Sequence, residues 1–148
     1  MKHRKDKFLL GVFLGILMVT MAVLSGCGAK AEPKPDPGSG KYLIYYLNSS
    51  LTKLVAQEYE TETKDQADLA EELMDQLLHV PRDLDCQPAV NEKVSFKTCR
   101  IDEQVLYLYF DGSYISMKPE QEILCRAALA RTMTQIPGIA YISIYRGD

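Results

Sequence analysis

The residue in this sequence with the clearest chemical assignment is Cys27, which directly follows Leu24, Ser25 and Gly26. A leucine, two small residues and a cysteine form the lipobox pattern of bacterial lipoprotein signals. The thiol of Cys27 is the group that would accept a diacylglycerol. The small side chains of Ser25 and Gly26 would let the backbone lie extended in a narrow peptidase cleft. We therefore expect recognition of this segment, cleavage before Cys27 and lipid modification of its sulfur.

The segment before Cys27 has the composition that export requires. Residues 1–7 carry four basic side chains and one Asp, and residues 8–24 are uncharged and apolar. As a helix, these 17 residues would span about 26 Å, slightly less than a bilayer core of about 30 Å. This length suits a cleaved signal peptide over residues 1–26, with an uncleaved single-span anchor as the alternative. Because the basic cluster stays cytoplasmic in both cases, the rest of the chain is predicted on the extracytoplasmic face of the cell membrane.

Charge and composition after the cleavage point restrict the partners. Residues 27–40 are predicted to be the lipidated cysteine and a flexible linker, since they are rich in Pro, Gly and small residues. The whole chain has a formal charge of −3 and residues 1–26 contribute +3, so the part from Cys27 onward has −6. An acidic domain without a basic stripe argues against nucleic acid as a partner. It also argues against electrostatic docking on anionic lipid, so attachment to the membrane depends on the acyl chain.

The remaining polar residues form no recognisable catalytic or metal-binding pattern. Beyond residue 26 the one histidine is His79, expected to stabilise a helix C-terminus, and no residues have the spacing of zinc ligands. No metal, other cofactor or enzymatic activity is predicted. Most of the carboxylates between residues 58 and 75 are expected to form solvated faces of a strand and a helix. Two interpretations are open for Cys86, Cys99 and Cys125: one disulfide with a free thiol, or three free thiols.

Apolar periodicity predicts a single α+β domain over residues 41–148. Strands are predicted at residues 42–47, 53–62, 93–101, 104–110 and 139–145. A capping box at Thr63 is predicted to open a helix that ends near His79. Pro119 is placed at the start of a second helix, whose packing face would contain Ile123, Ala127, Ala130 and Met133 together with Leu124, Ala128 and Leu129. The order is ββα-ββα-β, which favours a mixed or antiparallel sheet with both helices packed on one face.

Tyrosines are unusually frequent in the predicted strands. We single out four of them as a candidate surface for a protein partner: Tyr45, Tyr107, Tyr109 and Tyr114. Tyrosine combines a rigid contact area with a polar tip and is enriched at interfaces. The alternative is that these side chains are half-buried residues of a sheet.

Residues 41–145 resemble the GerMN family, the sporulation and spore germination module of bacterial envelope proteins. The resemblance is carried, in order, by YYLN (45–48), TKLV (52–55), the Leu-Leu-x-x-Pro helix end (77–81), LYLYF (106–110), RAA (126–128) and TMTQI (132–136). It implies an extracytoplasmic scaffold or interaction module, linked in some members to sporulation complexes, with no established catalytic residues. Members usually continue past the last strand, so a truncated C-terminus is one interpretation of this chain. The polar residue that members carry in the LYLYF strand is also absent.

Together these features predict a membrane-anchored lipoprotein with a GerMN-like protein-interaction module, related to sporulation or germination. A small-ligand-binding envelope lipoprotein is the first alternative, and a cell-wall hydrolase or hydrolase accessory is the second. A concave pocket lined by tyrosines and carboxylates would favour ligand binding. Two convergent carboxylates with perturbed pKa values would favour a hydrolase.

Overall fold

The computed structural model describes residues 35–147. The chain divides into two units, Met1–Glu32 and Pro33–Asp148, and the described residues belong to the second. The predicted signal peptide, Cys27 and most of the predicted linker lie outside them. The described elements follow the order η1 (Pro37–Ser39), β1 (Lys41–Asn48), β2 (Leu54–Glu60), α2 (Gln66–Leu78), β3 (Cys86–Gln87), β4 (Phe96–Asp102), β5 (Val105–Phe110), η2 (Gly112–Ser116), α3 (Pro119–Met133) and β6 (Tyr141–Arg146).

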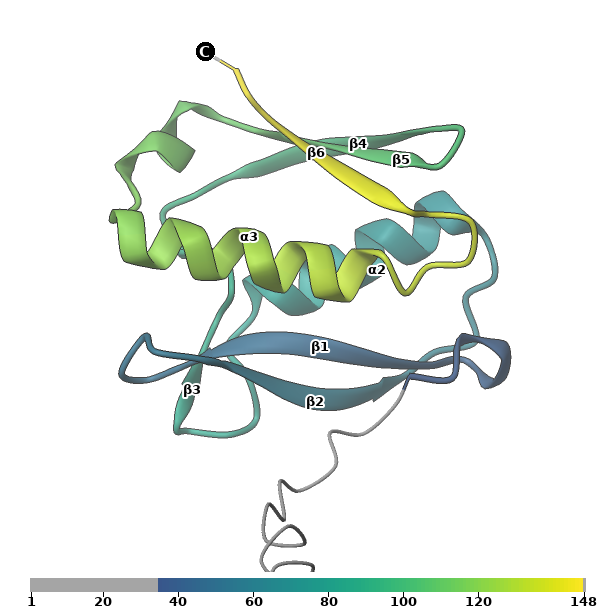
Figure 1. The fold of residues 1–148 in the computed structure, drawn as a ribbon, viewed down its shortest axis with the longest axis horizontal. Coiled ribbons are helices and arrows are strands. Elements are labelled where there is room, and N and C mark those ends of the chain that lie inside the picture. Colours follow the sequence, from purple (N-terminus) through teal and green to yellow (C-terminus); the bar gives the residue numbers. More distant parts are fainter. Residues whose placement is uncertain (1–34, 148) are drawn as a thin grey trace, which may run out of the picture. The chain divides into compact units, whose positions relative to one another are not determined.

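The strands form two three-stranded sheets, with α2 and α3 in the layer between them (Figure 1). Sheet A has the strand order β2-β1-β3 and sheet B the order β4-β5-β6. The predicted α+β class with two hairpins and two helices is confirmed. The expectation of one sheet with helices on one face is replaced by two sheets, because no strand of the first hairpin pairs with a strand of the second. Each helix therefore meets sheet residues on both sides. No helix within residues 35–147 is long and apolar enough to cross a membrane.

Sheet A is built around β1, in which every residue from Tyr42 to Leu47 is buried. β1 pairs antiparallel with β2 along its length, from Lys41 opposite Glu60 to Leu47 opposite Leu54. On its other side it pairs with the short β3, only at Leu47 and Asn48. No strand of the described part of the chain pairs with the rest of that second edge of β1.

Side chains at the C-terminal end of α3 and just after it occupy this part of the β1 edge. The Gln135 carboxamide accepts a hydrogen bond from the Leu43 N–H at 2.8 Å and donates one to the Leu43 carbonyl at 2.7 Å. The Thr132 hydroxyl accepts from the Tyr45 N–H at 3.2 Å. Because a buried backbone polar group without a partner is costly, these two side chains take the place of a neighbouring strand.

Sheet B combines a hairpin with a parallel strand. β4 pairs antiparallel with β5, with a bulge between Phe96 and Thr98. β5 and β6 are parallel, from Val105 beside Tyr141 to Phe110 beside Arg146, and α3 is the crossover between them. β5 is the central strand, as its two apolar faces predicted. Leu106, Leu108 and Phe110 face the helices and are buried.

The start of α2 differs from the predicted capping box. Asp65, two residues after Thr63, is the N-cap, and its carboxylate accepts from the N–H groups of Ala67 and Asp68 at 2.9 and 3.1 Å. A Ser, Thr, Asn or Asp side chain can fill this position, and here the aspartate lies closest to the first turn. The Thr63 hydroxyl instead donates to the carboxylate of Glu72.

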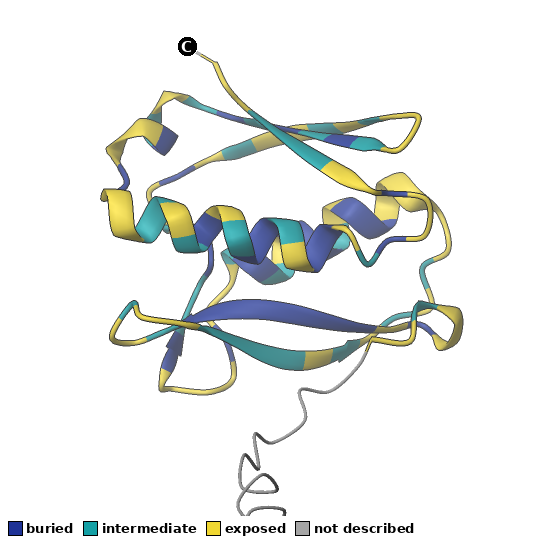
Figure 2. Cartoon of the chain, in the orientation of Figure 1, coloured by how far each residue is buried: buried dark blue, intermediate teal, exposed yellow. Residues whose placement is uncertain are grey.

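α3 starts at Pro119 as predicted, and its packing face matches the predicted one in part. The buried residues of α3 are Cys125, Ala128, Leu129, Thr132 and Met133. Of the predicted face, Ala128, Leu129 and Met133 are buried, while Ile123 is 69% exposed and Leu124, Ala127 and Ala130 are half-buried. Small and polar residues such as Cys125 and Thr132 complete the buried side, which a pattern based on strongly apolar residues overlooks. Figure 2 shows the exposed and half-buried side of α3 toward the viewer.

The last residues of the predicted linker form a defined turn before β1. Asp36 and Lys41 form an isolated antiparallel bridge around η1. Gly40 has a φ of +78°, and a Cβ there would lie 2.3 Å from the Thr61 carbonyl oxygen. The Thr61 N–H donates to the Gly40 carbonyl at 3.0 Å. This close approach between the two ends of the first hairpin requires glycine.

Candidate functional surfaces

The outer face of sheet B, turned away from the helices, brings tyrosines of two strands together. The register places Tyr109 beside Tyr145 and Tyr107 beside Ser143. The ring of Tyr145 stacks on that of Tyr109, with centroids 5.3 Å apart and planes at 22°, and lies 5.9 Å from that of Tyr107. Tyr145 is 47% exposed and Tyr141, on the same face of β6, is 66% exposed.

A basic side chain adjoins these rings. The Arg100 guanidinium lies over the Tyr107 ring, 4.9 Å from its centroid. Arg100 also approaches the Asp102 carboxylate at 3.7 Å, but both side chains are more than half exposed, so this pair is weak. We call Arg100, Tyr107, Tyr109, Tyr141 and Tyr145 the tyrosine face.

Two of the four tyrosines predicted to form a partner surface belong to this face, and two do not. Tyr107 and Tyr109 lie on it and are half-buried. Tyr45 is only 6% exposed, because Arg131 covers its ring at 4.1 Å from the centroid. Tyr114 is 1% exposed and packs on Phe110 at 5.1 Å, and burial raises its pKa to about 12. Including Tyr45 and Tyr114 in an exposed surface was therefore wrong.

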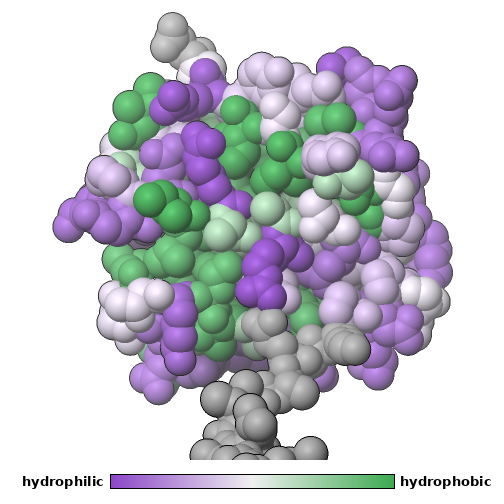
Figure 3. Space-filling view, in the orientation of Figure 1, coloured by the Kyte–Doolittle hydropathy of each residue, from purple (hydrophilic) through white to green (hydrophobic). Residues whose placement is uncertain are grey.

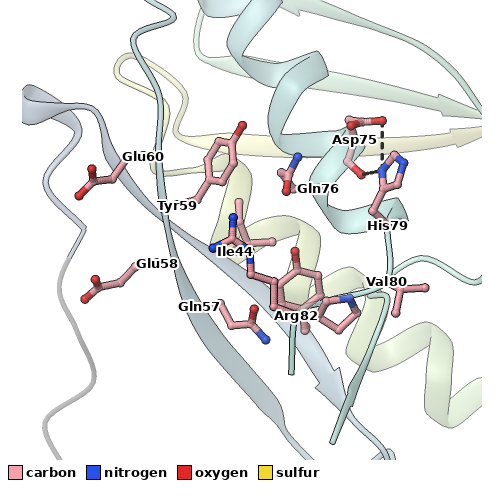
Figure 4. A pocket seen from close by; sticks show the side chains of 12 residues that line it. Ile44, Gln57, Glu58, Tyr59, Glu60, Asp75, Gln76, His79, Val80 and Arg82 are labelled. Atoms are coloured by element: carbon pink, nitrogen blue, oxygen red, sulfur yellow. Dashed lines mark hydrogen bonds and ion pairs between the residues drawn. The ribbon is translucent and has the colours of Figure 1, made fainter. Parts of the chain in front are cut away.

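A second candidate site is a groove of about 660 Å³ between sheet A and the C-terminal end of α2 (Figure 4). Tyr46 and Tyr59 line it from the strands, and Asp75, His79 and Arg82 from α2 and the loop that follows. The sequence did not predict this groove, since it requires β2 and the end of α2 to lie together.

The carboxylates around the groove do not converge. Asp75 is engaged with His79, whose Nδ1 lies 3.3 Å from the carboxylate and 2.7 Å from the Asp75 carbonyl oxygen. His79 thus stabilises the end of α2, as expected from its position. Glu58 and Glu60 extend from β2 on the side away from Asp75 (Figure 4), and Glu60 pairs with Lys41 at 3.4 Å. This arrangement does not provide the paired acid and base of a hydrolase.

Beside the groove, Glu72 accepts three hydrogen bonds. Its carboxylate accepts from the hydroxyls of Tyr59 at 2.6 Å, Thr63 at 2.6 Å and Thr61 at 3.0 Å. Burial acts to raise the pKa of Glu72, but these three bonds outweigh it and lower the pKa. Burial and the bond to Glu72 raise the pKa of Tyr59 to about 12. The expectation that Glu72 belongs to a solvated face was wrong, because it ties the β2–α2 connection to the helix.

The three cysteines of the domain are free thiols in the structure. Cys86 and Cys125 are buried, and burial raises the pKa of each thiol, that of Cys125 to about 12. Burial also raises the pKa of Cys99. Since the thiolate is the reactive form, these environments suit packing rather than nucleophilic chemistry. Residues 35–147 contain no group of three side chains placed to hold a metal ion.

The fold and these surfaces define a small α+β domain of the GerMN type, with two sheets around a shared helical layer and an exposed aromatic face. The chain belongs to the sporulation and spore germination family, which matches residues 43–147.

Solved structures share the fold. The first GerMN domain of the sporulation protein GerM from Bacillus subtilis superposes with a TM-score of 0.60 at 13% identity, over 72% of this chain and 82% of that one. The tandem GerMN domains of the same protein give a TM-score of 0.59 at 13% identity, over 72% of this chain and 38% of that one. No curated protein sequence matches the chain.

Proposed function

We propose that the chain is a membrane-anchored extracytoplasmic lipoprotein whose domain binds an envelope protein through the tyrosine face. The observation that carries this proposal is the stacked group of Tyr107, Tyr109 and Tyr145 with Arg100 on the solvent side of sheet B. Tyrosine and arginine dominate the energetic centres of protein interfaces. Membership of the family relates the domain to sporulation or germination.

Binding rather than catalysis is proposed as the work of the domain. The family is not known for enzymatic activity. Within residues 35–147 the two carboxyl groups with shifted pKa values, Glu72 and Asp111, are both lowered. Both are therefore ionised near neutral pH and hydrogen-bonded to neighbouring side chains, which suits structural roles better than proton transfer.

In-cell photo-crosslinking tests the tyrosine face. A photoreactive phenylalanine placed at Tyr109 is expected to give one adduct with another envelope protein, and Tyr107→Ser is expected to reduce that adduct at least tenfold. The same probe at Leu84, which is 92% exposed on the loop between α2 and β3, is the control. It should not give this adduct. An equal adduct from both positions, or an unchanged adduct after Tyr107→Ser, would contradict the proposal.

The anchor has a separate test. Cys27→Ala is expected to abolish incorporation of labelled fatty acid and to leave an unprocessed precursor, with Cys99→Ala as the matched cysteine control. Unchanged processing and membrane association of Cys27→Ala would overturn the lipoprotein assignment without affecting the proposed face.

The groove favours a second candidate function, binding of a small ligand. It combines two tyrosines with Asp75 and Arg82 and has the volume of a small-molecule site. A ligand bound there should shift the NMR signals of Tyr46, Tyr59 and Gln76 and leave those of Tyr107 and Tyr109 unchanged. Shifts confined to the tyrosine face would rule the groove out for that ligand.

A further inference from the structure

The edge strands of the two sheets differ in how they are protected. β2 carries exposed Glu58 and Glu60, and β4 carries exposed Lys97 at its bulge. Charges and bulges on edge strands prevent pairing with other chains. Among residues 35–147, β6 also ends a sheet, but its residues from Tyr141 to Tyr145 are uncharged, contain no proline and follow a regular register. This strand is therefore an edge suited to pairing.

The backbone direction shows which groups of β6 are available. The N–H groups of Tyr141 and Gly147 donate to β5, to the carbonyls of Gln104 and Phe110, at 3.1 and 3.0 Å. Because backbone groups alternate along a strand, Ile142 and Ile144 direct their N–H and C=O groups away from β5, to the open edge.

The sequence at this edge, Tyr-Ile-Ser-Ile-Tyr (141–145), is the same in both directions. We propose that β6 pairs antiparallel with β6 of a second copy of this chain, around a twofold axis that passes midway between the two copies of Ser143. In this register Ile142 lies opposite Ile144 of the second copy, and each such pair exchanges two backbone hydrogen bonds. Tyr141 lies opposite Tyr145 of the second copy, and Ser143 lies opposite its own equivalent. An isologous contact needs this kind of self-complementary patch.

The outward side of α3 supports the same arrangement. α3 contacts β6 from the helical layer, and the twofold axis is perpendicular to the sheet, so the two α3 helices would approach each other in that layer. Ile123, Ala127 and Ala130 follow helical spacing on the outward side of α3, and Ile123 is 69% exposed. Figure 3 shows hydrophobic patches, separated by hydrophilic ones, on the face of the molecule that carries α3 and β6. A second copy would cover this apolar row, and the small alanines would allow close packing of the helices.

This dimer goes beyond the proposed function, because it uses the edge of sheet B rather than its outer face. Sheet B would become a continuous six-stranded sheet. Tyr141 of each copy would extend the stack of Tyr109 and Tyr145 of the other, so the tyrosine faces would merge into one surface. Each pair of domains would then present one aromatic face and two lipid anchors.

A disulfide at the twofold axis tests the register. Ser143 is in a non-hydrogen-bonded pair with its equivalent, where Cα atoms are about 4.5 Å apart, within the range that a disulfide spans. Mild oxidation of membranes containing the full chain with Ser143→Cys is expected to give at least fivefold more covalent dimer than Thr98→Cys. Thr98 is the matched control, since it is exposed on the same face of β4, the other edge of sheet B. Equal dimer yields, or an adduct of Ser143→Cys with a different protein, would overturn the proposal.

Charged substitutions test the pairing of Tyr141 with Tyr145 of the second copy, and they need no new cysteine. Tyr141→Lys with Tyr145→Lys places like charges opposite each other in both pairs and is expected to make the full chain monomeric in detergent by analytical ultracentrifugation. Tyr141→Lys with Tyr145→Glu places opposite charges in both pairs and is expected to retain the dimer. Circular dichroism confirms that both variants fold, which the exposure of both side chains favours. Equal association of the two folded variants would contradict the register, and a monomeric parent chain would contradict the dimer itself. Neither result would affect crosslinking from Tyr109.

Discussion

Sheets A and B are built from the same parts in the same order, a hairpin, a helix and one further strand, but they complete their edges differently. In sheet A the further strand β3 has two residues, and Thr132 of α3 and Gln135 just after it bond to the β1 edge at Tyr45 and Leu43. In sheet B the further strand β6 has six residues and pairs parallel with β5, and no strand within residues 35–147 pairs with its outer edge. An edge closed by side chains within the chain supports stability, whereas an open edge is available for association.

The largest loss of stability is expected from a substitution in the helical layer that packs against both sheets. Leu73 of α2 is fully buried, and α2 contacts both β1 and β4. Leu73→Ala should lower the free energy of unfolding by about 3 kcal/mol through lost burial and a new cavity. Urea unfolding of the purified domain should still show one transition by both circular dichroism and tyrosine fluorescence. Two separate transitions would show that the sheets unfold as independent units. Glu71→Ala, on the exposed side of α2, is the control for the loss of stability in Leu73→Ala.

The next largest effect is expected at the closed edge. Gln135→Leu keeps most of the side-chain volume but leaves the N–H and C=O of Leu43 without partners, which should cost about 2 kcal/mol. Gln104→Leu, at the exposed β4–β5 turn, is the matched control and should change stability by less than about 0.5 kcal/mol. If the two variants unfold at the same urea concentration, the edge is not closed by Gln135.

A smaller, pH-dependent effect is expected where β2 meets α2. Because the folded state lowers the pKa of Glu72, its ionised form stabilises the fold above the ordinary pKa of Glu, about 4.3. This contribution is lost as pH falls from there through the lowered pKa. Glu72→Gln should therefore cost about 1.5 kcal/mol at pH 7 through weaker hydrogen bonds and should flatten the acid limb of the stability profile. Glu71→Gln should reproduce the parent profile, and an unchanged acid limb in Glu72→Gln would refute this role.

The smallest effect is expected on the tyrosine face of sheet B. Arg100→Ala removes the guanidinium from the Tyr107 ring and should cost about 0.5 kcal/mol, as for exposed cation–π pairs. Lys97→Ala removes an exposed charge from the same strand without a ring contact and is the comparison. A loss above about 2 kcal/mol for Arg100→Ala would mean that this face is part of the structural core instead of a free surface.

Local patterns predicted much of this fold. Alternation located both hairpins, Pro119 marked the start of α3, and the doubly apolar strand at residues 105–110 was correctly placed at the centre of a sheet. The alternation of side chains along this strand also placed Tyr107 and Tyr109 on one face, which is why these two members of the candidate surface lie together.

The other features of the fold and of the candidate surfaces depend on contacts between segments that are distant in the sequence. Local sequence patterns carry no information about these contacts. Whether a strand of the first hairpin pairs with a strand of the second determines if one sheet or two are formed, and local patterns do not specify this pairing. Burial of Tyr45 and Tyr114 depends on Arg131 and Phe110, which come from other elements. From the sequence, Glu72 and Gln135 have the pattern of ordinary surface residues. Their roles arise only in the fold, where Glu72 lies beside the β2–α2 connection and Gln135 beside the edge of β1.

The bonds from Thr132 and Gln135 to β1 also have a consequence for the order of folding. Leu43 is joined to Gln135 across 92 positions of sequence, and Tyr45 to Thr132 across 87. Such distant closures form late and slow the search for the native state, because a long loop must first be ordered. The amide hydrogens of Leu43 and Tyr45 should therefore exchange with deuterium only when the whole domain unfolds, and their exchange rates should report its global stability.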